Sequence, residues 1–237
     1  MTSGRNEPRV GLFGGTFNPI HLGHLRAAEE VREALDLDRI LFIPSRTPPH
    51  KRQDPLDPIA PAERRLDWVE RAIAAHKAFS IDRIEIDREG PSYLVDTLEA
   101  IRDRDPRARR PVFIVGEDAF AEMGEWRDPK KLFVLADFAI MTRPPGQLED
   151  LAERIPRIVE ADFEFGGDGR SARHREAGTR LELVSITALD ISSSRIRRAC
   201  RANRSIRFLV PESIHEAILE SGEFASLRGE GEEYEHG

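Results

Sequence analysis

Cysteine is nearly absent from this 237-residue chain, in which Cys200 stands alone. A single cysteine excludes a disulfide framework and a zinc site built on cysteines. We expect Cys200 to be a packed small side chain rather than a reactive thiol. No stretch approaches the ~18 consecutive apolar residues of a membrane-spanning helix, and the opening segment MTSGRNEPRV lacks the apolar core of a secretory signal. These absences predict a soluble, cytoplasmic protein with no membrane partner.

Lysine is scarce as well. Only four of the 36 basic residues are lysines, and 43 acidic residues bring the net charge to −7. Non-specific binding to nucleic acid needs a positive field, so nucleic acid is not expected as a partner. Local arginine clusters at 107–110 and 195–207 could still hold a small phosphorylated ligand.

Short apolar runs alternate with segments of helical periodicity along most of the chain. Strands are expected at 10–13, 40–43, 111–115, 138–141 and 181–186, and helices at 24–37, 65–75, 92–102, 193–202 and 212–220. Continuous apolar strands between amphipathic helices are typical of a parallel sheet that is covered on both faces. The pattern predicts an α/β fold: an open, doubly wound parallel sheet in a single domain, with a small C-terminal helical part.

The remaining segments are expected to be irregular. We expect the α/β core to span 8–190 and the C-terminal helical part 191–222, with disordered tails at 1–7 and 226–237. The proline-rich segment 45–61 is too long for a simple connection and predicts a loop. The segment Gly166–Gly178 is rich in glycine and charge without apolar periodicity, which predicts a mobile surface loop.

Two adjacent glycines, Gly14 and Gly15, follow the first expected strand. They let the backbone turn tightly and approach a ligand closely, and ligands of open parallel sheets bind at this edge. Backbone N–H groups in such a turn form an anion cradle with the start of the next helix. The glycine spacing matches neither the dinucleotide motif nor the P-loop.

Two histidines, His21 and His24, lie three residues apart at the mouth of that helix, so both rings can face one side. A metal site would need a third ligand, and none lies nearby in the sequence. The pair is better explained as donors to phosphate oxygens.

A second polar group, Ser192-Ser193-Ser194 with Arg195 and Arg197, lies near the C-terminus. Serines at a helix start are ordinary N-caps when they stand alone. Together with the helix dipole and an arginine one turn into the helix, they also suit the phosphate groups of a nucleotide.

These two segments resemble the signatures of the nucleotidyltransferase superfamily that carries the HxGH motif. The first signature is matched by His21-Leu22-Gly23-His24, and the second, Ile-Ser-Ser-Thr-x-Ile-Arg, by Ile191–Arg197 with Ser194 in place of threonine. The whole of 8–222 is similar to the bacterial nicotinate-nucleotide adenylyltransferase family. Further matches are Pro48-Pro49-His50-Lys51, Ser92–Leu98 with Leu94 in place of threonine, Gly116-Glu117-Asp118 followed by Trp126, and Leu209-Val210-Pro211.

The resemblance implies a Rossmann-like nucleotidyltransferase fold and a reaction. ATP and nicotinate mononucleotide would give nicotinate adenine dinucleotide and pyrophosphate in NAD biosynthesis. Mg²⁺ would be carried with the ATP, since no acidic metal cage is visible in the sequence. Two alternatives stay open: a sister enzyme acting on nicotinamide mononucleotide or another phosphorylated acceptor, and a non-catalytic nucleotide-binding module. A homo-oligomer also stays open.

The resemblance implies site residues too. His21 and His24 would be catalytic, with His24 nearest the reacting phosphate. Lys51 would close over the triphosphate, or it could be a solvated loop charge. The implied ATP site comprises Gly14, Gly15, Thr16, Phe17, His21, His24, Ser193, Ser194 and Arg197. The implied acceptor site comprises Tyr93, Thr97, Asp118, Trp126 and Arg127.

The two tryptophans differ in their surroundings. Trp68 lies beside Leu66 and Val69 on an expected helix and is predicted to be core. Trp126 lies in a polar, proline-bounded segment, which favours a stacking platform for the pyridine ring.

Arg127 and Asp118 each have a second interpretation. Arg127 stands where the family has an aromatic residue or histidine, and its guanidinium offers only donors, in a fork that matches a carboxylate. We hypothesise that it recognises the acid of nicotinate; the alternative is a solvated arginine that points away from the site. Asp118 could bind ribose hydroxyls or could cap a helix.

Overall fold

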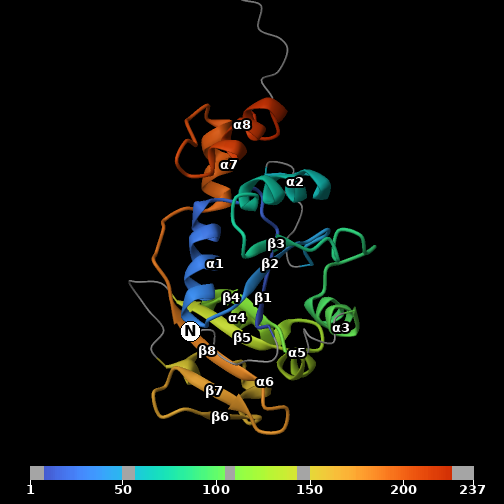
Figure 1. The fold of residues 1–237 in the computed structure, drawn as a ribbon, viewed down its shortest axis with the longest axis vertical. Coiled ribbons are helices and arrows are strands. Elements are labelled where there is room, and N and C mark those ends of the chain that lie inside the picture. The colour runs from blue at the N-terminus through green and yellow to red at the C-terminus, as the bar shows by residue number, and fades with distance from the viewer. Residues whose placement is uncertain (1–7, 50–56, 105–109, 143–149, 226–237) are drawn as a thin grey trace, which may run out of the picture.

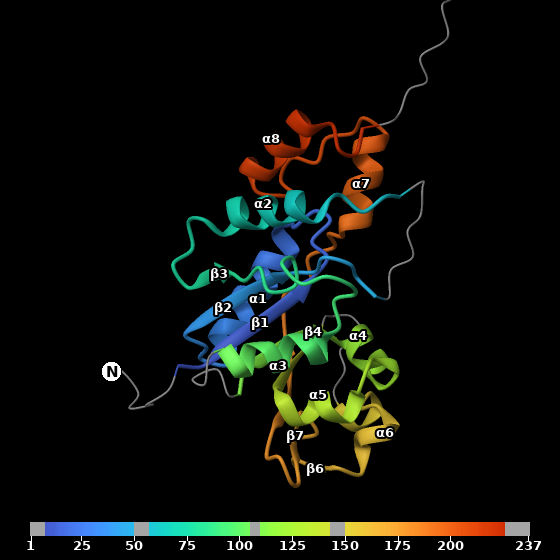
Figure 2. The ribbon, with the colours of Figure 1, turned by 90° about the vertical axis from the view of Figure 1, so that its right-hand side faces the viewer.

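The computed structural model describes residues 8–49, 57–104, 110–142 and 150–225. One sheet runs through the molecule with helices on both faces (Figures 1 and 2). The strands are β1 Val10–Gly15, β2 Arg39–Pro44, β3 Phe79–Ile81, β4 Val112–Gly116, β5 Asp137–Thr142, β6 Phe163–Phe165, β7 Ser171–His174 and β8 Arg180–Ser185. The helices are α1 Leu22–Ala34, α2 Ala62–Ile73, α3 Leu94–Arg104, α4 Glu117–Glu122, α5 Pro129–Leu135, α6 Arg157–Glu160, α7 Ser193–Arg201 and α8 Glu212–Ser221, with short 3₁₀ turns at Met123–Glu125 and Leu151–Glu153.

The strand order is β3-β2-β1-β4-β5-β8-β7-β6. All pairings from β3 to β8 are parallel, whereas β8, β7 and β6 pair antiparallel. Chain order reverses between β1 and β4, and ligands of open α/β sheets bind outside the carboxyl ends of strands at such a point. The predicted open, doubly wound α/β fold is confirmed, with an antiparallel hairpin added at one edge.

Side chains of the central strands alternate between two cores, one on each face of the sheet. In β1, Phe13 belongs to the first core, while Val10 and Leu12 belong to the second. The first core lies under α1, α2, α7 and α8, and the second lies under α3, α4, α5 and α6. Trp68 is fully buried in the first core, which confirms its predicted place there, and Cys200 packs against the same core as expected.

The C-terminal helices α7 and α8 lie beyond α2 at one end of the molecule (Figure 1). They are tied to the core through Trp68, whose ring centroid is 5.5 Å from that of Phe224. The expected tails at 1–7 and 226–237 lie outside the described residues.

The expectation of a mobile loop over Gly166–Gly178 is wrong. This segment contains β7, which pairs Ala172 with Phe165 of β6 and with Leu181 of β8. Its inward side chains are Ala172 and His174, which are buried, while Arg173 points outward. A short alternation of alanine and histidine with arginine carries little hydrophobicity, so the strand period is hidden in the sequence.

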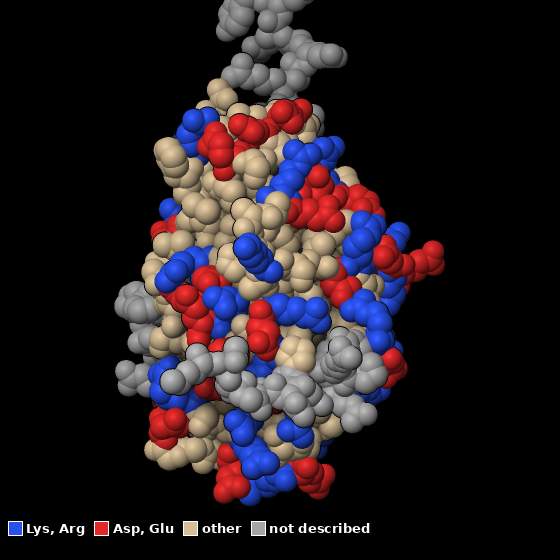
Figure 3. Space-filling view, viewed as in Figure 1, with Lys and Arg blue, Asp and Glu red and all other residues tan. Residues whose placement is uncertain are grey.

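Acidic and basic side chains are interspersed over the face of the molecule in Figure 3, which shows no continuous field of one sign. Within the described ranges no helix is long and apolar enough to cross a membrane.

Candidate active site

Two pockets of about 340 Å³ each lie at the carboxyl ends of the strands, on either side of the loop that follows β1. The signature pocket is lined by residues of β1, α1, β5 and α7 and of the segments that precede α1 and α7: Phe13, His21, Gly23, His24, Ala27, Met141, Ile186, Thr187, Leu189, Ile191, Ser192, Ser193, Ser194 and Arg197. The tryptophan pocket is lined by Gly14, Gly15, Thr16, Ser45, Pro48, Pro49, Glu85, Ser92, Tyr93, Leu94, Phe113, Ala119, Trp126, Arg127 and Leu132. The segment from the end of β1 to the start of α1 therefore supplies Gly14, Gly15 and Thr16 to one pocket and His21, Gly23 and His24 to the other.

The two signature histidines stack on each other, with ring centroids 3.7 Å apart and an interplanar angle of 24°. The backbone N–H of His21 donates to Nδ1 of His24 at 3.3 Å. A nitrogen that accepts carries no proton, so the neutral His24 ring holds its proton on Nε2. Phe17 packs edge-on against the same ring, with centroids 5.2 Å apart. His24 is thus held as an oriented donor in the pocket wall.

Gly23 makes this stacking possible. A Cβ atom at position 23 would lie 3.0 Å from Nδ1 and 3.1 Å from Cε1 of His21. The glycine of the first signature is therefore needed for close packing against the histidine ring.

The second signature begins α7. Ser192 is the N-cap, and its Oγ accepts from the backbone N–H of Arg195 at 3.3 Å. Ser193 donates its hydroxyl proton to the carbonyl of Pro19 at 2.9 Å, which joins the two signatures directly. Because that proton is used, Ser193 can offer a phosphate only its backbone N–H, one of the donors that a first helical turn leaves unsatisfied.

Arg197 is 8% exposed and lines the signature pocket. Its NH1 donates to the carbonyl of Asn18 at 2.7 Å, and its Nε donates to Oδ1 of Asp57 at 2.7 Å. The arginine predicted for the triphosphate is thus in the pocket wall, with its orientation set by protein contacts.

In the tryptophan pocket, Trp126 is partly buried against the second core. Arg127 lies over the ring of Tyr93, with its guanidinium carbon 4.8 Å from the ring centroid. Its NH1 is 3.6 Å from Oδ2 of Asp96, and the side chain is 53% exposed. Arg127 is thus part of the pocket lining, and its guanidinium lies between the ring of Tyr93 and solvent.

A buried carboxylate, Glu85, forms part of the same wall. The hydroxyl of Thr97 donates to its Oε1 at 2.7 Å, and Ser92 hydrogen-bonds it as well. Burial raises the pKa of Glu85, while these hydrogen bonds act in the opposite direction. Ser45 also lines this pocket, and its buried hydroxyl oxygen has no hydrogen-bond partner among the described residues.

Arg65 of α2 holds the loops of both pockets together. It is 1% exposed and donates to the carbonyls of Thr16 at 2.7 Å, Arg46 at 3.1 Å and Ala60 at 2.9 Å. Burial lowers its pKa to about 10, a value that still leaves the guanidinium charged at neutral pH.

Comparisons with known proteins agree with this geometry. A family model described as cytidylyltransferase-like matches residues 12–199. A protein of Trichlorobacter lovleyi, named "Probable nicotinate-nucleotide adenylyltransferase", is 44% identical over 214 residues, which cover 90% of this chain and 98% of the relative. The chain belongs to the nicotinate-nucleotide adenylyltransferase family.

A second relative supports this family, and a solved structure supports the fold. A relative of the same name from Pelobacter propionicus is 41% identical and covers 90% of this chain and 96% of its own length. The nicotinic acid mononucleotide adenylyltransferase of Plasmodium falciparum, solved with NaAD, superposes with a TM-score of 0.68 over 92% of this chain and 97% of that chain. At 15% identity this second likeness concerns the fold.

The structure brings most of the site residues expected from the family into the two pockets, but some lie elsewhere. Gly14, Gly15 and Thr16, expected at ATP, line the tryptophan pocket. Phe17 is 2% exposed and supports His24 from behind. Lys51 lies outside the described residues.

Two residues expected at the acceptor also lie outside the pocket linings. Thr97 is fully buried, and it contacts the pocket wall through its hydrogen bonds with Glu85 and with the carbonyl of Tyr93. Asp118 is exposed in the first turn of α4, and it lines neither pocket.

Three functional candidates were missed by the sequence reasoning: Glu85, Ser45 and Thr187. Thr187 lines the signature pocket, and its N–H and hydroxyl both donate to Glu30 of α1 at 2.6 Å. Glu85 stands between Ile84 and Ile86, Thr187 follows Ile186 and Ser45 follows Pro44, so no polar cluster or motif marks any of the three in the sequence.

Proposed function

We propose that the chain is a cytoplasmic enzyme of NAD biosynthesis that transfers the adenylyl group of ATP to nicotinate mononucleotide. Pyrophosphate and nicotinate adenine dinucleotide are the products. The observation that carries this proposal is the pair of pockets on either side of one loop, because the reaction needs two nucleotides with their phosphates adjacent. The name shared by the relatives supports nicotinate mononucleotide as the acceptor.

The chemistry requires positioning rather than a base. The acceptor phosphate is largely dianionic at neutral pH, since its second pKa is about 6. One of its oxygens attacks the α-phosphorus of ATP, and the bond between that phosphorus and the oxygen bridging to the β-phosphorus breaks. Pyrophosphate leaves with the electron pair. Catalysis then depends on alignment and on stabilising the charge that develops.

His24 and His21 would stabilise the reacting phosphates. With Nδ1 accepting from the backbone, His24 would donate from Nε2, and its ring lies in the signature pocket. Stacking against His21 and edge-on packing against Phe17 fix the ring before the substrate binds. A donor that is already oriented costs no reorganisation in the transition state.

The leaving pyrophosphate would be bound by the start of α7. The backbone N–H groups of Ser193 and Ser194 and the guanidinium of Arg197 converge on the signature pocket. The polar lining of that pocket consists of imidazoles, hydroxyls and a guanidinium, with no carboxylate among the residues that the structure describes. The donor set fits Mg²⁺ that arrives bound to the triphosphate, where the ion would neutralise phosphate charge.

The acceptor would lie in the tryptophan pocket. Trp126 and Tyr93 would stack on or border the pyridine ring, and Arg127 would face its carboxylate. Thr97 would act by holding Glu85. Gly14, Gly15 and Thr16 would allow close approach of the acceptor phosphate to the loop between the pockets. Lys51 at the triphosphate and Asp118 at a ribose remain proposals taken from the family pattern.

Pyrophosphate release measured with ATP and a panel of acceptors tests the proposal. Nicotinate mononucleotide should be turned over with the highest kcat/KM. Preference for nicotinamide mononucleotide or for phosphopantetheine would assign a sister activity. Nucleotide binding without release of pyrophosphate from any acceptor would indicate a non-catalytic module.

A further inference from the structure

Asp57 lies against the arginine of the second signature. Its two carboxylate oxygens face Arg197: Oδ1 accepts from Nε at 2.7 Å, and Oδ2 accepts from NH2. Arg201, one turn further along α7, donates from NH1 to Oδ1 at 2.9 Å. These two guanidinium groups lower the pKa of Asp57 to about 2, so its carboxyl group is ionised at neutral pH.

The other contacts of this cluster lead to the first signature loop. Arg197 also donates from NH1 to the carbonyl of Asn18 at 2.7 Å. The Asn18 side chain in turn accepts from the N–H of Ala60 at 3.0 Å and donates to the carbonyl of Pro58 at 3.2 Å. Asp57, the segment after it and the loop after β1 therefore form one hydrogen-bonded unit around Arg197.

Arg197 has donors to spare while all these bonds are made. A guanidinium has five N–H groups, and the described residues use one on each of Nε, NH1 and NH2. One N–H on each terminal nitrogen remains. Arg197 lines the signature pocket with its contacts intact, so a ligand can reach it without displacing Asp57.

We propose that Asp57 is a positioning residue, which fixes the Arg197 guanidinium so that its remaining donors face the phosphates of ATP. The inference rests on the proposed function, because it takes the ligand of the signature pocket to be a triphosphate. Long side chains lose rotamer freedom on binding, and an arginine already held in place loses less.

The sign of the effect makes the proposal testable. Asp57→Asn removes one negative charge near the phosphates, so electrostatics alone would tighten binding of an anion. Loss of positioning has the opposite effect. An amide also presents one acceptor where the carboxylate presents two, so the bidentate contact with Arg197 is lost.

The experiment titrates ATP, magnesium pyrophosphate and adenosine into the full-length wild type and variants by calorimetry, alongside steady-state kinetics. Asp57→Asn is expected to raise the Kd of ATP and of pyrophosphate about 10-fold, and the KM of ATP with them. The Kd of adenosine and the KM of the acceptor should stay at their wild-type values, which general damage to the fold would not allow.

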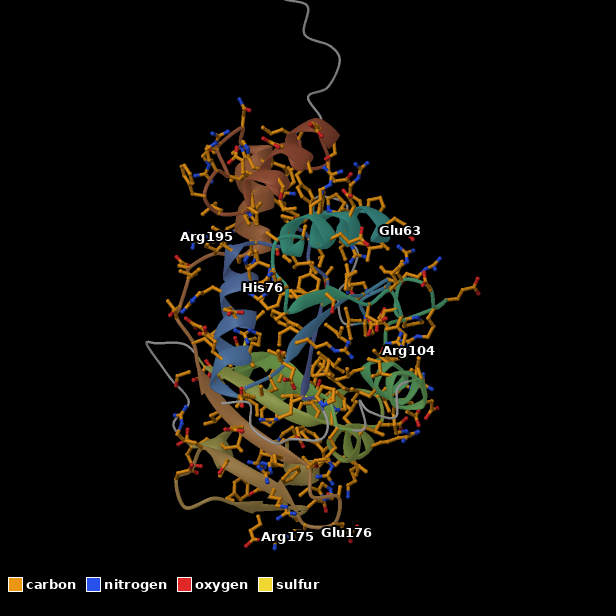
Figure 4. The ribbon with its side chains drawn as sticks, viewed as in Figure 1. Glu63, His76, Arg104, Arg175, Glu176 and Arg195 are labelled. Carbon is orange, nitrogen blue, oxygen red and sulfur yellow. The ribbon has the colours of Figure 1, made fainter. Side chains whose placement is uncertain are left out.

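Asp190→Asn is the matched control. Asp190 lies just before α7 and pairs with Arg195, which is on the same helix as Arg197. The Asp190 side chain is 92% exposed. Arg195 lies at the start of α7, at the outer edge of the molecule (Figure 4). This variant removes the same charge at the same helix and should leave all the binding constants within two-fold of wild type.

Asp57→Glu keeps the charge and moves the oxygens by one methylene, so it tests geometry even if Asp57→Asn fails to fold. A loss of about three-fold, confined to ATP and pyrophosphate, is expected. Wild-type affinity in Asp57→Glu, or unchanged or tighter phosphate binding in Asp57→Asn, would overturn the positioning role and leave the enzyme assignment standing. A wild type that binds neither ATP nor pyrophosphate would instead overturn the proposed function.

Discussion

The two pockets are assembled from the chain in different ways. Residues 21–27 and 186–197 provide the whole lining of the signature pocket except Phe13 and Met141. The tryptophan pocket draws on 14–16, 45–49, 85, 92–94, 113 and 119–132. Phosphate binding depends on N–H groups at a helix start and on one or two fixed side chains, which a short motif can encode. A pocket shaped for a flat ring needs walls from many segments, so its contacts depend on tertiary structure.

The comparison predicts that the signature pocket controls turnover. His24→Ala should lower kcat by roughly 10²–10³, because the variant loses a donor whose main effect is in the transition state. The Kd of ATP should change much less. His76→Ala is the control, since that ring stacks on Phe79 with centroids 3.8 Å apart and lines neither pocket. A His24→Ala enzyme with turnover within a few-fold of wild type would remove His24 from the catalytic set.

Arg65 offers a way to disturb both pockets at once. Arg65→Met should lower the free energy of unfolding by about 2–4 kcal/mol, because three carbonyls lose a charged donor inside the protein. The KM values of both substrates should rise together. Arg64→Met is matched in sequence position, and its side chain is 46% exposed. The measurement is the free energy of unfolding of the two variants in urea. Equal values would show that the buried contacts of Arg65 do not stabilise the fold.

A change at Trp126 should affect the tryptophan pocket and leave the signature pocket unchanged. Trp126→Ala should weaken acceptor binding by about 1–3 kcal/mol through lost stacking, which raises the acceptor KM about 5- to 150-fold. The KM of ATP should not change. Phe208→Ala removes an aromatic ring that is 79% exposed and serves as the control. Equal changes in both KM values would mark Trp126 as a structural residue.

The smallest expected effect concerns the choice between acid and amide. Arg127→Gln should reduce the preference for nicotinate over nicotinamide mononucleotide about 3- to 10-fold, since solvent weakens a contact made by a half-exposed guanidinium. The measurement is the ratio of kcat/KM for the two acceptors. Arg102→Gln, on the exposed side of α3, controls for the lost charge. A ratio within two-fold of wild type contradicts the role of Arg127, and a wild type that prefers the amide contradicts the substrate.

The sequence predicts the central part of the fold well, because its strands are continuous apolar runs. β1, β2, β4, β5 and β8 lie where periodicity places them, within about two residues at either end. The short elements are not predicted by periodicity. β3 has three residues and α4 has six, which are too few to show a repeat of apolar positions. The hairpin of β6 and β7 is not predicted either, because one of its buried positions is the polar residue His174.

The candidate site divides in the same way. His21, His24, Ser193 and Arg197 follow from two short motifs, and the structure places all four in one pocket wall. The roles of Glu85 and Asp57 could not be read from the sequence, because each depends on tertiary contacts. Glu85 is buried and bonded to Thr97, and Asp57 meets Arg197 across 140 positions. A lone carboxylate looks solvated until its tertiary neighbours are known.

Both outer strands of the sheet, β3 and β6, have only three residues in the part of the chain that the structure describes. Each presents few free main-chain groups, so another chain would gain little by pairing with either edge. Growth of the sheet from one molecule into the next is therefore disfavoured at both ends. The short edges thus protect the sheet against extension by a strand of another molecule.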